Sequence, residues 1–187
     1  TPSPSEFDLG PMFTVAQIEQ GMEKWQVPDV GLIEHMETHD LRGTVDSDPM
    51  DFDDPTGCLD FFQSSWPKAT FQVYGEGGYA PGKIAAGWVF LFKDQETAAN
   101  GLQAEIECID NGCCHNHTED VTRSNMKNVS GASYYQVSVR SPEGAYTDIG
   151  ISYGNANATV RLMEEDGSGD LDPEEITRLF VEAMIYA

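Results

Sequence analysis

Residues 85–114 constrain the fold more than any other part of the chain, because a strand, a helix and three cysteines follow one another there. Residues 86–92, with the sequence AGWVFLF, form a near-continuous apolar run that ends at Lys93 and Asp94. A run of this length and composition is typical of a strand buried in the middle of a sheet. We therefore predict a central strand over these residues.

A helix is predicted directly after this strand. Asp94 suits the N-cap position, since its side chain can accept a hydrogen bond from the first helical turn. Apolar residues then recur at helical spacing, so one stripe of the helix should face the sheet. This stripe consists of Ala98, Leu102, Ile106 and Ile109.

The cysteines indicate a disulfide framework. They are Cys58, Cys108, Cys113 and Cys114. Their number in an acidic chain without a C-x-x-C motif favours disulfides in an oxidising compartment over a zinc cage. A bond between the neighbours Cys113 and Cys114 would close a strained ring, so we expect Cys58 to pair with one of the three later cysteines. The alternative, reduced thiols in the cytosol, would leave Cys113 and Cys114 as an oxidisable cluster beside His115 and His117.

Two further helices are predicted near the ends of the chain. Thr14 and Gln17 form a capping box for a helix over residues 14–26, which ends before Pro28. Near the C-terminus, Asp172 is the predicted N-cap of a last helix. Pro173 is its first residue, and Glu175 completes a capping box. Its apolar residues are spaced for burial, and they are Ile176, Leu179, Phe180, Ala183 and Met184.

The remaining strands come before and after the central unit. A strand over residues 69–74 precedes it, and three segments after it alternate between apolar and polar residues, namely 135–140, 147–153 and 158–163. Short turns between the last three predict an antiparallel meander with one face on the core. The fold class is therefore α+β, an antiparallel sheet of about five strands with helices packed on it and tied by disulfides. We expect residues 13–187 to form one domain behind a disordered, linker-like tail over residues 1–12.

The net charge limits the classes of partner. It is -22, from 32 acidic and 10 basic residues, so nucleic acid would be repelled and cationic partners are favoured. The alternative is that the acidity only keeps the protein soluble. No apolar run is close to the length of a membrane span, which needs about 18 residues. No signal peptide precedes the domain, so we expect that it is absent or was removed before Thr1.

Residues 164–175 resemble the twelve-residue EF-hand calcium loop. A glycine stands at the turning position and a glutamate at the last, bidentate position. The predicted calcium ligands are Glu164, Asp166, Ser168, Asp170, Asp172 and Glu175. The alternative is a capped turn in which Asp172 and Glu175 only cap the last helix.

The histidines suggest a different, transition-metal site. His35 and His39 are four residues apart, which on a helix would place both rings on one face, and His115 and His117 would share one side of an extended segment. With a cysteine or carboxylate they would suit Zn or Cu, as a metal-binding protein or a metal-dependent hydrolase. The alternative for residues around His35 is an exposed polar turn or short helix. Nucleophile motifs such as G-x-S-x-G and S-x-x-K are missing, which favours binding over catalysis.

Several of these features also occur together in a known family. They are the linker-like start, the capped first helix, Cys58, the strand ending in Phe92-Lys93-Asp94, Ala98-Ala99 in the next helix, its Cys-bearing end, and the Tyr153-Gly154-Asn155 turn. This layout resembles the secreted sensor-like domains of actinobacteria, which include cell-envelope lipoproteins and the extracellular domains of mycobacterial-type receptor kinases.

The resemblance covers most of residues 14–187. It implies an extracytoplasmic, non-catalytic ligand-binding or sensing domain with a cleft over the sheet, secreted or anchored to the cell envelope through a removed N-terminal segment. The acidic surface, the adjacent Cys113 and Cys114 and the acidic Gly-Ser-Gly loop depart from the family pattern. The resemblance therefore carries no functional residue over to this chain.

Overall fold

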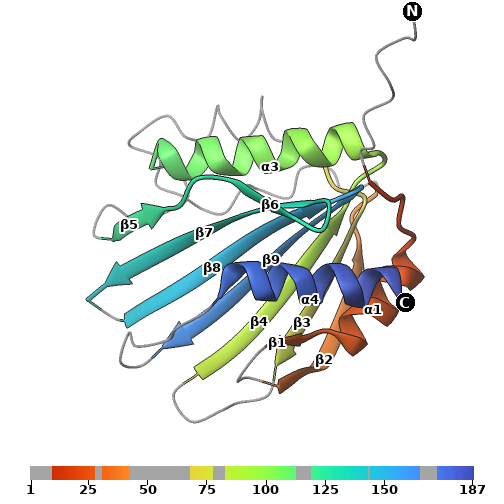
Figure 1. Cartoon of the computed structure of the whole chain (residues 1–187), viewed down its shortest axis with the longest axis horizontal. Coiled ribbons are helices and arrows are strands. Elements are labelled where there is room, and N and C mark those ends of the chain that lie inside the picture. The colour runs from red at the N-terminus through yellow and green to blue at the C-terminus, as the bar shows by residue number, and fades with distance from the viewer. Residues whose placement is uncertain are drawn as a thin grey trace, which may run out of the picture.

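The computed structural model describes residues 10–27, 31–42, 68–77, 83–112, 119–142, 144–164 and 172–187. Three helices and nine strands lie in these residues (Figure 1). The helices are α1 (Val15–Lys24), α3 (Gln95–Asp110) and α4 (Pro173–Ile185). The strands are β1 (Gln26–Val27), β2 (Gly31–Asp40), β3 (Phe71–Gly77), β4 (Lys83–Leu91), β5 (Asp120–Arg123), β6 (Lys127–Val129), β7 (Ala132–Ser141), β8 (Gly144–Tyr153) and β9 (Ala156–Glu164).

The nine described strands form one antiparallel sheet, which confirms the α+β class but corrects the predicted number of about five strands. The order across the sheet is β1-β2-β3-β4-β9-β8-β7-β5, and β6 also pairs with β7. Strand β4 lies between β3 and β9, so the apolar run over residues 86–92 is a central strand as predicted. The prediction missed β1, β2, β5 and β6, which are short or mostly polar.

Strand β2 shows why the residues around His35 were misread. His35, Glu37 and His39 alternate with Met36 and Thr38 along the strand. Met36 packs against the core, and the Thr38 hydroxyl donates to Glu19 on α1. Among residues 34–40 of the strand, Met36 is the single apolar residue, so a period of two was hard to recognise. The prediction of an exposed turn or short helix was therefore wrong.

The last three long strands form the predicted meander. Tyr153 pairs with Ala156, so Gly154 and Asn155 make a two-residue turn between β8 and β9. Ser141 pairs with Gly144, which leaves two residues in the turn between β7 and β8. Such short turns fix the register of both strand pairs.

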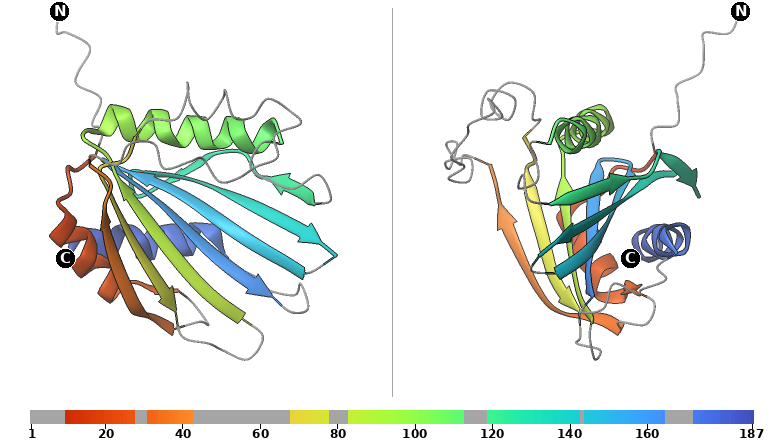
Figure 2. Two further views of the ribbon diagram at one scale, coloured as in Figure 1. Left: turned by 180° about the vertical axis from the view of Figure 1, so that it is seen from behind. Right: turned by 90° about the vertical axis from the view of Figure 1, so that its left-hand side faces the viewer.

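Helices cover both faces of the sheet (Figures 1 and 2). Helices α1 and α4 pack on one face, where Ile18, Met22 and Phe180 join Val89 and Val160 in the larger core cluster. Helix α3 packs on the other face, where Leu102 and Ile106 meet residues of β7 in a second cluster. In the part of the chain that the structure describes, no helix is long and apolar enough to cross a bilayer.

The predicted helix starts are largely confirmed. Thr14 and Gln17 form the capping box of α1. Asp94 caps α3 by accepting a hydrogen bond from the Thr97 amide at 2.7 Å. Asp172 caps α4, but it accepts from the Glu174 amide, and Glu175 bonds to Arg178 instead of closing the predicted box.

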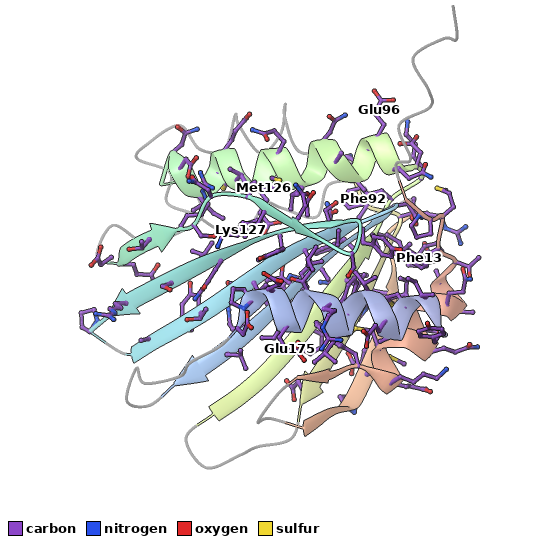
Figure 3. The ribbon with its side chains drawn as sticks, viewed as in Figure 1. Phe13, Phe92, Glu96, Met126, Lys127 and Glu175 are labelled. Atoms are coloured by element: carbon purple, nitrogen blue, oxygen red, sulfur yellow. The ribbon has the colours of Figure 1, made fainter. Side chains whose placement is uncertain are left out.

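The segment before α1 is attached to the turn between β8 and β9. The buried Asn155 side chain accepts from the Phe13 amide at 2.7 Å and donates to the carbonyls of Phe13 and Phe92, each at 3.1 Å. Figure 3 shows Phe13 and Phe92 at the end of the sheet where the strands converge. Gly154 has a φ of +60°, and a Cβ there would overlap the Pro11 carbonyl, so this position requires glycine.

Cys108 is fully buried on α3 and is disulfide-bonded. Its partner lies outside the described residues, as do Cys58, Cys113 and Cys114. The pairing of Cys58 with a later cysteine therefore stays a prediction.

Candidate ligand-binding site

A pocket of about 130 Å³ lies between α3 and the sheet face that α3 covers. It combines apolar and aromatic walls with a few polar groups, which is the usual composition of small-molecule sites. Helix α3 supplies two lining residues, and strands β4, β7, β8 and β9 supply the others. The lining consists of Trp88, Glu105, Ile109, Tyr135, Val137, Asp148, Thr159 and Arg161.

An ion pair between two neighbouring strands forms one part of the lining. Arg161 on β9 lies opposite Asp148 on β8 in register. The guanidinium donates from Nε to Oδ1 of Asp148 at 2.8 Å and from Nη2 to Oδ2 at 2.7 Å. These bonds to Asp148 raise the pKa of Arg161. Two parallel bonds of this kind fix the orientation of both side chains.

The same guanidinium lies over two aromatic rings. Its Cζ lies 4.2 Å from the centroid of Tyr146 and 5.3 Å from that of Trp88. Both distances are within the range of cation–π attraction. The arginine is therefore a rigid wall of the pocket, with its charge matched by Asp148.

Glu105 forms the helical side of the pocket. It is partly buried on α3 and shares a hydrogen bond with the hydroxyl of Tyr135. Burial raises the pKa of the Glu105 carboxyl from 4.5 to about 7, the hydrogen bond with Tyr135 opposes this shift, and the charge of Asp148 adds to it. Burial also raises the pKa of Tyr135, which therefore stays a neutral phenol. Glu105 is thus a carboxyl that can change its protonation state near neutral pH.

Gly150 places the Tyr135 ring beneath Glu105. Tyr135 and Gly150 are register partners on β7 and β8. A Cβ at Gly150 would overlap the ring and hydroxyl of Tyr135. Because Gly150 has no side chain, the Tyr135 ring can lie against strand β8, with its hydroxyl within reach of α3.

The predicted calcium ligands are only partly described by the structure. Asp166, Ser168 and Asp170 lie outside the described residues. Glu164 ends β9, while Asp172 and Glu175 begin α4 on the sheet face opposite α3 (Figure 3). Glu175 is bound by Arg178, with Nη2 at 2.6 Å from Oε2. The calcium site remains a prediction.

The histidines predicted as metal ligands are only partly placed. His115 and His117 lie outside the described residues. His35 and His39 lie on strand β2 and not on a helix, and Glu37 lies between them with Oε atoms 3.5 and 3.6 Å from their Nε2 atoms. Within the described ranges, no group of three or more His, Cys, Asp or Glu side chains could hold a metal ion.

None of the pocket residues was predicted as a site residue, although two signals pointed to them. Glu105 interrupts the apolar stripe of α3, because it lies one turn after Leu102 and one turn before Ile109. The two-residue turn at Gly154 and Asn155 also sets Asp148 opposite Arg161, at partly buried positions of a covered sheet. Opposite charges at paired, covered positions mark a polar feature of the interior.

Comparisons with known proteins identify no family. No family model and no curated protein matches the sequence. Among solved structures, the chain is similar to the extracellular domain of PknH from Mycobacterium tuberculosis, with a TM-score of 0.45 and 10% sequence identity over 94% of this chain and 93% of that chain. A likeness at this TM-score carries no conclusion about function, so the resemblance to sensor-like domains stays a hypothesis.

Proposed function

We propose that this chain is a non-catalytic, sensor-type domain that binds a small ligand in the pocket between α3 and the sheet. The observation that carries the proposal is the pocket itself, where apolar walls surround a fixed ion pair and a partly buried carboxyl. Its volume of about 130 Å³ is below the roughly 300–1,000 Å³ of pockets for drug-sized ligands. The ligand is therefore a small molecule, or one end of a larger one.

The lining favours binding over catalysis. It contains no Ser, Cys or His among the described residues, so Ser–His and Cys–His pairs are missing from it. Arg161 and Asp148 satisfy each other, and Tyr135 is a neutral hydrogen-bond partner of Glu105. Such an arrangement suits recognition by shape and charge.

Two observations support a location outside the cytoplasm, secreted or at the cell envelope. Cys108 is disulfide-bonded, and structural disulfides persist mainly in oxidising compartments. The sequence also resembles extracytoplasmic sensor-like domains in its helix caps, central strand and turn at Tyr153-Gly154-Asn155.

The proposal is tested by a fragment screen on wild type and on a variant with a filled pocket. Small amines, alcohols, amides and carboxylates are tested by ligand-observed NMR. Thr159→Ile adds apolar volume to the pocket lining, and Thr122→Ile makes the same change at an exposed position on β5. We expect fragments that bind wild type and Thr122→Ile but lose about tenfold or more in affinity on Thr159→Ile. If fragments bind all three proteins alike, or none of them, the pocket is not the ligand site.

A further inference from the structure

The charges on the pocket lining do not balance when Glu105 is ionised. The charged residues of the lining are Glu105, Asp148 and Arg161. Arg161 forms its bidentate pair with Asp148, so these two charges cancel. Glu105 has the hydroxyl of Tyr135 as its hydrogen-bond partner, and a neutral phenol supplies no positive charge. One negative charge is therefore in excess, and a cation would neutralise it.

The uncharged walls suit an alkyl group or a cation. Trp88 and Tyr135 provide aromatic rings, and Ile109 and Val137 provide apolar side chains. Aromatic faces attract ammonium groups, and the attraction grows when the site excludes water. The formal net charge of -22 also raises the local concentration of cations around the protein.

The groups around Glu105 come from several elements. Tyr135 on β7 bonds to it, and Asp148 on β8 acts on it through its charge. Arg161 on β9 is paired with Asp148 and is also influenced by Tyr146 and Glu119. Arg123 on β5 lies near Tyr135 but is bound by Asp110 on α3, with two bonds of 2.7 Å. Both arginines are thus held by aspartates, and neither neutralises Glu105.

We propose that the pocket binds a small protonated amine, with its ammonium group on the Glu105 carboxylate and its alkyl part against Trp88 and Ile109. A protonated Glu105 gives up its proton to solvent when the amine binds. This inference rests on the proposed function and names its ligand class. The exchange balances, because one cation enters as one proton leaves.

The exchange makes binding depend on pH in a defined direction. Burial raises the pKa of Glu105 to about 7, so about half of the molecules carry a protonated carboxyl at that pH. The amine binds the ionised form, and its apparent affinity follows the ionised fraction. The affinity should therefore rise about tenfold between pH 6 and pH 8 and then level off.

The test uses three probes with similar numbers of heavy atoms: n-butylammonium, 1-butanol and propionate. Dissociation constants are measured by NMR titration of wild type at pH 6, 7 and 8, at constant ionic strength. Calorimetry in two buffers of different ionisation enthalpy counts the protons released. Glu105→Gln removes the carboxylate, and Glu107→Gln makes the same change at an exposed position on the same helix.

We expect n-butylammonium to bind tightest, with about half a proton released per ligand at pH 7 and the tenfold rise with pH. Glu105→Gln should lose this preference and the pH dependence, while Glu107→Gln should keep both. The inference is overturned, with the proposed function intact, if 1-butanol or propionate binds in the pocket as well as the amine, or if the amine binds there without releasing protons. If none of the probes binds and the fragment screen is also negative, the proposed function fails as well.

Discussion

At the scale of single residues, Glu105 is the most informative group in the molecule. It lies in the covered stripe of α3, hydrogen-bonded to a buried tyrosine and close to Asp148. A carboxyl in this position costs stability when it is ionised, because burial and the neighbouring negative charge both disfavour the anion. A binding site can tolerate this loss of stability. A residue that only packs would stabilise the fold more if it were apolar.

The first prediction follows from the sign of this pKa shift. The native state holds the Glu105 proton up to about pH 7, whereas the unfolded chain releases it near its ordinary value of 4.5. The free energy of unfolding should therefore fall as pH rises from about 4.5 to 7, and this contribution should stay lost above pH 7. Glu105→Gln does not titrate, so it should be more stable than wild type by up to about 3 kcal/mol at pH 8, and the gain should vanish near pH 4.

Urea unfolding of both proteins between pH 4 and pH 8 measures this difference. Glu107→Gln is the matched control and should show no comparable pH-dependent gain. A difference between Glu105→Gln and wild type that is constant with pH would contradict the assigned pKa.

At the scale of elements, the turn between β8 and β9 joins three parts of the fold. Asn155 bonds to the segment before α1 through Phe13 and to the end of β4 through Phe92. Its own backbone amide donates to Pro11 at 3.2 Å, and its carbonyl accepts from the Phe92 amide at 2.9 Å. This turn therefore holds the N-terminal segment against the converging end of the sheet.

The second prediction concerns this asparagine. Asn155→Ala leaves the Phe13 amide and two buried carbonyls without their side-chain partner, so it should lower the free energy of unfolding by about 3 kcal/mol. Asn125→Ala, at an exposed position between β5 and β6, should change it by less than about 0.5 kcal/mol. Urea unfolding checks both values, and equal effects of the two substitutions would show that the Asn155 bonds add nothing.

The third prediction keeps the calcium loop open to test. Calcium should stabilise wild type by about 1.4 kcal/mol at tenfold saturation of a site with a dissociation constant of about 10⁻⁴ to 10⁻³ M. Since Arg178 bonds to both Glu175 and Glu182, the variants Glu175→Gln and Glu182→Gln each remove one partner of the same arginine. Only Glu175→Gln should lose the calcium-dependent shift in thermal midpoint, because only Glu175 is a predicted ligand. If calcium shifts no midpoint, or all three alike, the loop is a capped turn.

Elements with strong local signals were predictable, and those that depend on long-range packing were not. The central strand, the capped helices and the meander turns follow from apolar periodicity, cap residues and turn residues. Strand β2 lacked a clear pattern, since its residues around His35 are polar on one face and only weakly apolar on the other. The pocket could be predicted from the sequence only by combining the hairpin register of Asp148 and Arg161 with the position of Glu105, because its walls come from five separate elements.

At the scale of the whole molecule, the two faces of the sheet are packed with different kinds of residue. The face under α1 and α4 is a large apolar core, whereas the face under α3 mixes a smaller apolar cluster with charged residues. Under α3 the two arginines are each paired with an aspartate, whereas Glu105 has only a phenol as its partner among the described residues. In the proposed function, the face under α1 and α4 stabilises the fold and the face under α3 binds the ligand.

The fourth prediction concerns the covalent tie. Cys58 should be bonded to one of the three later cysteines, which closes a loop of about fifty residues or more and contributes roughly 4 kcal/mol in the chain-entropy model. Mass spectrometry of unreduced peptides identifies the pairs. A free Cys58, or a bond between Cys113 and Cys114, would show the predicted framework to be wrong.

The central claim is that the face under α3 holds the ligand site. It is tested most directly by mapping amide and indole chemical-shift changes while n-butylammonium, 1-butanol and propionate are titrated in turn into assigned wild-type protein. The account predicts that the shifts caused by any binding probe centre on Trp88, Glu105, Ile109, Thr159 and Arg161, and that Thr159→Ile removes them. Shifts that centre on α1 and α4 would contradict it, as would a lack of saturable shifts with every probe together with a negative fragment screen.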